Sequence, residues 1–210
     1  MNGMSPIVFV VDDDPSMRRS MSRFIASAGF RARVFASAEE FLACDPPGCA
    51  ACLVLDIKMP RMSGLDLQEE MARRGILIPV IFITGHGTVS TSVRALKGGA
   101  VDFLEKPFDR CALLDAIERA FARDRTVRRE RSAGNDIARR IASLTPRERQ
   151  VLSLVVSGKL NKQTAGELGI AEKTVKVHRA RVMRKMKASS LAELVLLAAG
   201  RKRLHAADEK

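Results

Sequence analysis

Five polar side chains in the first half of the chain end or follow apolar runs, and together they suit phosphoryl-transfer chemistry. Asp12 and Asp13 follow the first run and Asp56 follows a later one, while Thr84 and Lys106 come after two more. Clustered carboxylates repel one another unless a hard cation such as Mg²⁺ shares them. An aspartate nucleophile, a divalent cation, an ammonium group and a hydroxyl donor are the parts that phosphoryl transfer uses.

These side chains can meet only if the apolar runs are strands of one sheet. Helical patterns alternate with the runs through residues 1–122, which predicts an α/β fold with a doubly wound, five-stranded parallel sheet and helices on both faces. The carboxyl ends of such strands share one edge, where ligands bind. We therefore expect the five side chains to converge there. The expected strands are Ile7–Val11, Ala32–Phe35, Cys52–Leu55, Val80–Ile83 and Val101–Leu104.

The charge of the chain is divided unevenly between its two halves. The first 120 residues carry 14 basic and 15 acidic side chains, whereas the rest of the chain carries 22 basic and 9 acidic ones. A basic half joined to a nearly neutral one suggests a module that binds a polyanion. No apolar run near the start is long enough for a signal peptide or a membrane span, so we expect a cytoplasmic protein that does not bind membranes.

The basic half reads as a small all-α domain of four helices, residues 141–210, behind an Arg-rich linker, residues 123–140, that we expect to be partly helical. A short helix, a turn at Gly169 and a long basic helix have the form of a helix-turn-helix. On a helical wheel, the long helix separates an apolar stripe from a basic face that a DNA major groove would accept. The stripe comprises Val175, Val182 and Met186, and the basic face comprises Lys173, Lys176, Val177, Ala180, Arg181 and Arg184. The alternative to a DNA-binding face is that these basic side chains only form the solvent-exposed side of the helix.

The first 122 residues resemble the receiver domain of response regulators, which has a flavodoxin-like fold. The segments VVDDDP, LVLDIKMPRMSG, VIFITGHG and AVDFLEKPF stand in the order and at the spacing of that family's signatures. The resemblance implies that Asp56 is the phosphoacceptor and that its site binds Mg²⁺. The metal residues would be Asp13, Asp56 and the main-chain carbonyl of Lys58, with Asp12 holding the ion through water. It further implies that Thr84 and Lys106 bind the phosphoryl oxygens, that Phe103 is the switch aromatic, and that the Lys106–Pro107 bond is cis.

Residues 141–203 are similar to the LuxR-type output domain, and the whole chain resembles response regulators of the NarL/FixJ class. This resemblance implies a helix-turn-helix that binds double-stranded DNA at promoter repeats, with contacts from Thr174, Lys176, Val177, His178, Arg181 and Lys185. Three residues depart from the family pattern: Thr164 replaces an apolar residue, Ala171 replaces a capping Ser or Thr, and Gly166 lies inside a short helix. These departures predict a helix-turn-helix domain of low stability.

Together these resemblances predict a transcriptional regulator and not an enzyme. A sensor histidine kinase would phosphorylate Asp56, and the protein would then form a homodimer and bind its promoters. Two alternatives stay open, namely a pseudo-receiver that acts without phosphorylation and an aspartyl-phosphate phosphatase. Phosphatases of the haloacid-dehalogenase type carry a second Asp two residues after the nucleophile, where this chain has Lys58. The Cys49–Cys52 pair could bind zinc or carry redox chemistry, but it has no partner pair at ligand spacing, which favours ordinary reduced cysteines.

Overall fold

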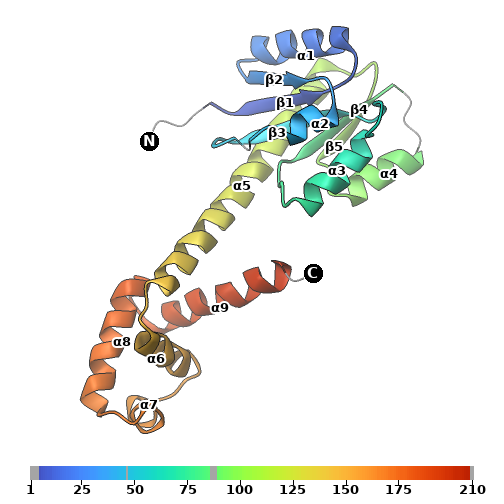
Figure 1. The fold of residues 1–210 in the computed structure, drawn as a ribbon. Helices are drawn as coiled ribbons and strands as arrows, with labels where there is room; N and C mark the ends of the chain where they lie inside the picture. The colour runs from blue at the N-terminus through green and yellow to red at the C-terminus, as the bar shows by residue number, and fades with distance from the viewer. Residues whose placement is uncertain (1–4, 46, 86–88, 209–210) are drawn as a thin grey trace. The chain divides into compact units, whose positions relative to one another are not determined.

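The computed structural model describes residues 5–45, 47–85 and 89–208, and it divides into two compact units, residues 1–128 and 129–210. Figure 1 shows the ribbon of both units, and each is described here by itself. In the described part of the chain, no helix combines the length and the apolar character that crossing a membrane requires.

The first unit is built on a five-stranded parallel sheet with the strand order β2-β1-β3-β4-β5, so the predicted doubly wound α/β fold is confirmed. The strands lie within one residue of their predicted bounds at every end. They are β1 (Ile7–Val11), β2 (Arg31–Phe35), β3 (Ala51–Asp56), β4 (Val80–Thr84) and β5 (Asp102–Glu105). Because β1 lies next to β3, the chain places the segments after these two strands at one edge of the sheet.

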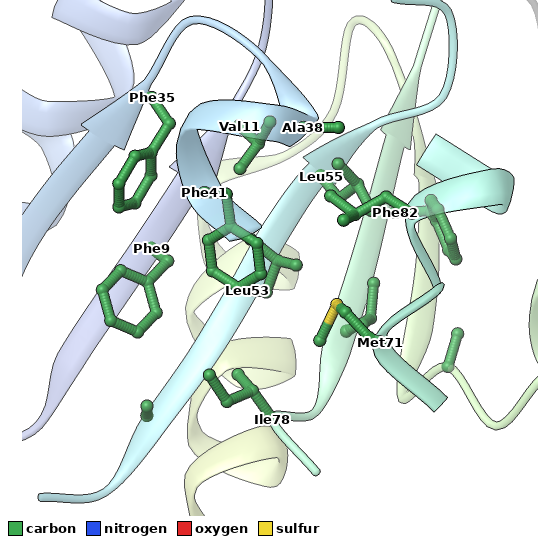
Figure 2. Close-up of a cluster of buried hydrophobic side chains, with 14 of the residues drawn as sticks. Phe9, Val11, Phe35, Ala38, Phe41, Leu53, Leu55, Met71, Ile78 and Phe82 are labelled. Atoms are coloured by element: carbon green, nitrogen blue, oxygen red, sulfur yellow. The ribbon is translucent and has the colours of Figure 1, made fainter. Parts of the chain in front are cut away.

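Helices cover both faces of this sheet, because successive strand residues point to opposite sides. One core cluster contains Phe9, Phe41 and Phe82 and lies beneath α2, α3 and α4, as Figure 2 shows for several of its members. The other contains Val10 and lies beneath α1 and α5. The helices are α1 (Pro15–Ser27), α2 (Ala38–Leu42), α3 (Gly64–Arg73), α4 (Val89–Lys97) and α5 (Arg110–Ala142).

Helix α5 runs without interruption through residues 123–140, where the sequence suggested a helix that fades into a linker. The Ser-Ala-Gly-Asn segment at 132–135 does not end it, because one glycine costs a helix only about 1 kcal/mol. Asp136 adds local support through ion pairs with Arg139 and Arg140 on the next turn.

The second unit contains the four expected helices after α5, namely α6 (Pro146–Val156), α7 (Asn161–Leu168), α8 (Glu172–Met186) and α9 (Leu191–Asp208). Thr145 followed three residues later by Glu148 is the sequence pattern of a capping box, and the two residues form one at the start of α6. Gly169 ends α7 with a φ of 61°, which favours glycine. Apolar side chains from α6, α8 and α9 and from the end of α5 share one core, which includes Ile141, Val151, Val182 and Leu194.

Candidate functional site

Two buried carboxylates meet one ammonium group at the carboxyl edge of the sheet. Lys106, which follows β5, places its Nζ 2.7 Å from Asp56 Oδ1 and 3.0 Å from Asp12 Oδ2. Asp12 and Asp56 are only 4% and 7% exposed. The parallel sheet thus brings Lys106 into contact with Asp12, which lies 94 positions earlier in the chain, and with Asp56, which lies 50 positions earlier.

The pKa values of Asp56 and Lys106 depend on burial and ion pairing, which act in opposite directions. Burial raises the pKa of Asp56 above its usual value, and the nearby Asp12 charge raises it further, against the lowering effects of Lys106 and the Lys58 N–H. Burial alone would lower the pKa of Lys106, but its contacts with Asp56 and Asp12 raise it overall. The ammonium of Lys106 therefore stays charged, whereas burial disfavours the charged form of the Asp56 carboxylate.

The loop after β3 holds Asp56 in place through its backbone. The Lys58 N–H donates to Asp56 Oδ2 at 2.8 Å, and the Gly64 N–H donates to the carbonyl oxygen of Ile57 at 2.9 Å. A Cβ atom on Gly64 would lie 2.3 Å from the main-chain oxygen of Asp56. Only glycine fits there, so the start of α3 packs directly against the residue that carries the carboxylate.

The remaining receiver residues lie on the two strands beside this site. Thr84 ends β4 and is 1% exposed, and its carbonyl oxygen accepts the Lys106 N–H at 2.7 Å. Phe103 pairs in register with Phe82 across β4 and β5 and is partly buried against the core. The Lys106–Pro107 bond is cis, as the resemblance implied.

The donors at this edge suit a hard cation, although the structure does not gather all three predicted carboxylates. Asp13 is exposed, and in the described part of the chain no group of three or more Asp, Glu, His or Cys side chains is close enough to hold a metal ion. Asp12 and Asp56 do meet, and Mg²⁺ usually takes one or two protein carboxylates and keeps several waters. Oxygen donors beside an under-neutralised carboxylate therefore fit Mg²⁺.

The second unit presents the predicted helix-turn-helix, with α7 packed on α8. Val175, Val182 and Met186 are buried, which confirms the apolar stripe of the helical wheel. The residues of the predicted basic face are all exposed, and Val177 is 46% exposed among them. Helix α8 therefore offers a cationic face with a small apolar spot at its centre.

The six predicted DNA contacts differ in their surroundings. Thr174, Lys176, Val177 and Arg181 are exposed, with the Lys176 ammonium 3.7 Å from Glu172. His178 is partly buried, and its Nδ1 has no hydrogen-bond partner within the described residues. The Lys185 Nζ instead lies 2.7 Å from Oε2 of the buried Glu148. Contact of each with DNA stays a prediction.

Sequence reasoning missed two buried acids that hold elements together. The sequence pattern places Glu148 only in a capping box. Its hydrogen bond with Lys185 joins residues 37 positions apart, and no local sequence pattern indicates such a contact. Asp124 on α5 is 3% exposed, accepts the Ala51 N–H at 3.0 Å and pairs with Arg128. An acid one turn after the apolar residues Ala120 and Phe121 could have indicated the second case.

The predicted departures from the helix-turn-helix pattern are visible as missing hydrogen bonds. The Thr164 hydroxyl is fully buried in α7 and has no hydrogen-bond partner among the described residues. Ala171 stands at the N-cap of α8 and forms no side-chain cap. Both features cost stability.

Known proteins match the chain in both units. Residues 8–118 match the response regulator receiver domain, and residues 142–198 match the luxR family of bacterial regulatory proteins. Nodulation protein W of Bradyrhizobium diazoefficiens is 51% identical over 189 residues, which cover 90% of this chain and 83% of that protein. The transcriptional regulatory protein FixJ of Azorhizobium caulinodans is 45% identical over 191 residues, with coverage of 91% and 90%. The solved structure of the response regulator StyR is similar with a TM-score of 0.83 at 48% identity, covering 93% of this chain and 99% of that one.

Proposed function

The chain belongs to the two-component response regulators of the NarL/FixJ class, which are phosphorylation-dependent DNA-binding transcriptional regulators, and we propose that its phosphoacceptor is Asp56. The observation that carries this proposal is the contact of Lys106 with both Asp12 and Asp56 at the edge of the sheet. A sensor histidine kinase would supply the phosphoryl group, and double-stranded promoter DNA would be the ligand of the second unit.

The buried Asp56 carboxylate acts as the nucleophile. One of its oxygens forms a bond to phosphorus while the phosphorus–nitrogen bond of a phosphohistidine breaks, and the imidazole regains a proton. Lys106 stays beside the new acyl phosphate and offsets part of its charge, and Thr84 would donate to a phosphoryl oxygen. Mg²⁺ would be held by Asp13, Asp56 and the Lys58 carbonyl, with Asp12 acting through water, and it would supply positive charge beside the phosphoryl group.

The same proposal assigns the parts of the chain. Residues 1–122 form the receiver, 123–140 the linker and 141–210 the output domain, which leaves both family matches whole. Phosphorylation would move Thr84 and Phe103 inward and favour a homodimer, whose two output domains bind promoter repeats. Because the proposed ligand is promoter DNA, the protein would act in the cytoplasm. Lys58, an exposed residue where phosphatases carry a catalytic acid, supports a slowly hydrolysed phosphoryl group and a role other than metabolic catalysis.

Labelling by acetyl phosphate tests the assignment of Asp56. We expect the wild type to gain one phosphoryl group, detected by intact-mass spectrometry, only when Mg²⁺ is present. Asp56→Asn should gain none, whereas Asp115→Asn, which changes an exposed acid of α5, should behave as the wild type. Equal labelling of Asp56→Asn and wild type would show that the acceptor is another residue.

A further inference from the structure

The ammonium group of Lys185 lies inside the second unit and not on the exposed face of α8. Its Nζ donates to Glu148 Oε2 at 2.7 Å and to the carbonyl oxygen of Ser143 at 3.0 Å. The side chain of Lys185 is 30% exposed, and that of Glu148 only 3%. A lysine that already holds two oxygen acceptors of its own chain is poorly placed to hold a phosphate as well.

Glu148 is fixed from two further sides. Its Oε2 accepts the Thr145 N–H at 2.9 Å, and its own N–H approaches the Thr145 hydroxyl at 3.3 Å. The hydrogen bond from Lys185, with that from the Thr145 N–H, lowers the pKa of Glu148 to about 2. The Glu148 carboxylate is therefore charged at neutral pH, and its hydrogen bonds join the start of α6 to the end of α8.

A second contact joins the end of α8 to the end of α5. The Arg140 guanidinium donates to the carbonyl oxygen of Met186 at 3.0 Å, and Asp136 holds the same guanidinium from the other side. Met186 is itself fully buried in the core that contains Ile141 and Leu144. Lys185 and Met186 thus tie the last turn of α8 to residues 140–148, the segment in which α5 ends and α6 begins.

From these contacts we infer that Lys185 and Glu148 are a positioning pair for DNA recognition, which sets where α8 lies on its own domain, and that Lys185 does not neutralise a DNA phosphate. This inference rests on the proposed function of the second unit as the DNA-binding domain. A recognition helix reads bases only when its exposed side chains align with the groove. The pair fixes the end of that helix, so its loss should weaken recognition of the preferred sequence more than general attraction to DNA.

Salt dependence separates a positioning residue from a phosphate contact. Each phosphate contact contributes about 0.9 to the slope of log affinity against log salt concentration on B-DNA. We would label the full chain and each variant with acetyl phosphate and Mg²⁺, and then measure their affinities by fluorescence anisotropy across a salt series, on two duplexes. One duplex is selected from a random library with the wild-type protein, and the other is its shuffled version. The variants are Lys185→Met, Glu148→Gln, their double mutant, and Lys176→Met as an exposed control on the same helix.

We expect Lys185→Met and Glu148→Gln each to lose about tenfold in affinity for the selected duplex, the worth of one well-aligned base contact. Both should keep the wild-type salt slope and the wild-type affinity for shuffled DNA, and the double mutant should be no weaker than either single one. Lys176→Met should instead change sequence preference or flatten the slope. Far-UV circular dichroism at the assay temperature would verify that each variant is folded.

Two results would overturn the inference. A slope for Lys185→Met that is shallower by about two, one phosphate contact for each protomer of the homodimer, with equal loss on both duplexes, would make Lys185 a phosphate contact. Tighter binding of Glu148→Gln to both duplexes would mean that Glu148 withholds a DNA-binding lysine. Failure of the phosphorylated wild type to bind any duplex would contradict the proposed function itself, and is thereby distinct from both results.

Discussion

Gly64 is the position where a single methyl group should disturb the proposed phosphoacceptor most directly. In Gly64→Ala the new Cβ would lie 2.3 Å from the main-chain oxygen of Asp56 and 3.1 Å from the Cα of Ile57, whereas ordinary contacts begin at 3.4 Å. The obstructing atoms belong to the backbone at the end of a buried strand, so no flexible side chain can move aside. Strand β3 and the start of α3 must separate by about 1 Å to relieve such a contact.

The size of the effect follows from two opposing contributions. Overpacking by one methyl group costs about 1–3 kcal/mol, and the rigid surroundings place this site near the upper end. Alanine recovers about 0.5–1 kcal/mol over glycine, because it loses less backbone entropy in the first turn of a helix. We therefore expect the free energy of unfolding of the receiver to fall by about 2 kcal/mol. Labelling of Asp56 by acetyl phosphate should slow by about 10- to 100-fold, since its backbone is displaced.

Phenylalanine emission reports on this unit alone, because all nine Phe residues lie between positions 9 and 121 and the chain has no Tyr or Trp. Urea unfolding followed by that signal gives the midpoint and slope for the receiver. Gly48→Ala is the matched control, since a Cβ there meets nothing within 4 Å and its φ is not in the left-handed region. If Gly64→Ala unfolds at the same urea concentration as Gly48→Ala and is labelled as fast as the wild type, the close approach of α3 to Asp56 is not what holds this loop.

Three further predictions concern the switch and the second unit. Thr84→Ala should still be labelled by acetyl phosphate, because Asp56 and Lys106 remain, but it should not dimerise with an acyl-phosphate mimic in gel filtration; normal dimerisation would contradict its role in the switch. Thr164→Val replaces a buried hydroxyl that has no partner within the described residues, so it should stabilise the second unit by about 1 kcal/mol in thermal unfolding; a lower midpoint would show that the hydroxyl is satisfied. Because the folded pKa of Glu148 is depressed from 4.5 to about 2, its contribution is complete above pH 4.5 and is lost as the pH falls from 4.5 towards 2. After allowance for solvent around Lys185, we expect Glu148→Gln to be less stable than wild type by about 1–3 kcal/mol at pH 7, and this difference to vanish near pH 2 in urea titrations by circular dichroism.

Local features of the fold were predictable because their causes lie within a few residues. The apolar runs gave the strands to within about a residue, and Thr145 with Glu148 gave the capping box that begins α6. The wheel of α8 separated buried from exposed side chains correctly, because an amphipathic helix buries one stripe wherever it packs. The continuity of α5 through Gly134 was not predictable in this way, since composition indicates a weak helix there but cannot say whether it breaks.

Contacts between distant residues were predictable only where topology forced them. Lys106 was expected beside Asp12 and Asp56 because parallel strands end at one edge. The same rule does not say which of two adjacent acids turns inward, and successive side chains leave an extended segment in opposite directions. Asp12 is buried while Asp13 faces solvent. Glu148 and Lys185 meet because α6 packs against α8, and the spacing of residues in the sequence does not predict that packing.

The charge balance at the sheet edge links these geometric details to regulation. Asp12, Asp56 and Lys106 together carry one net negative charge in a largely buried place, and burial raises the pKa of Asp56 even with the Lys106 ammonium beside it. A phosphoryl group on Asp56 replaces one carboxylate charge with nearly two, in surroundings where unpaired charge is costly. Such a state is favoured when positive charge and hydrogen-bond donors lie close to it. This edge offers Lys106 and Thr84, and a bound divalent cation would add to them. On the proposed function, a structural change that followed phosphorylation would respond to the extra negative charge placed in this largely buried site.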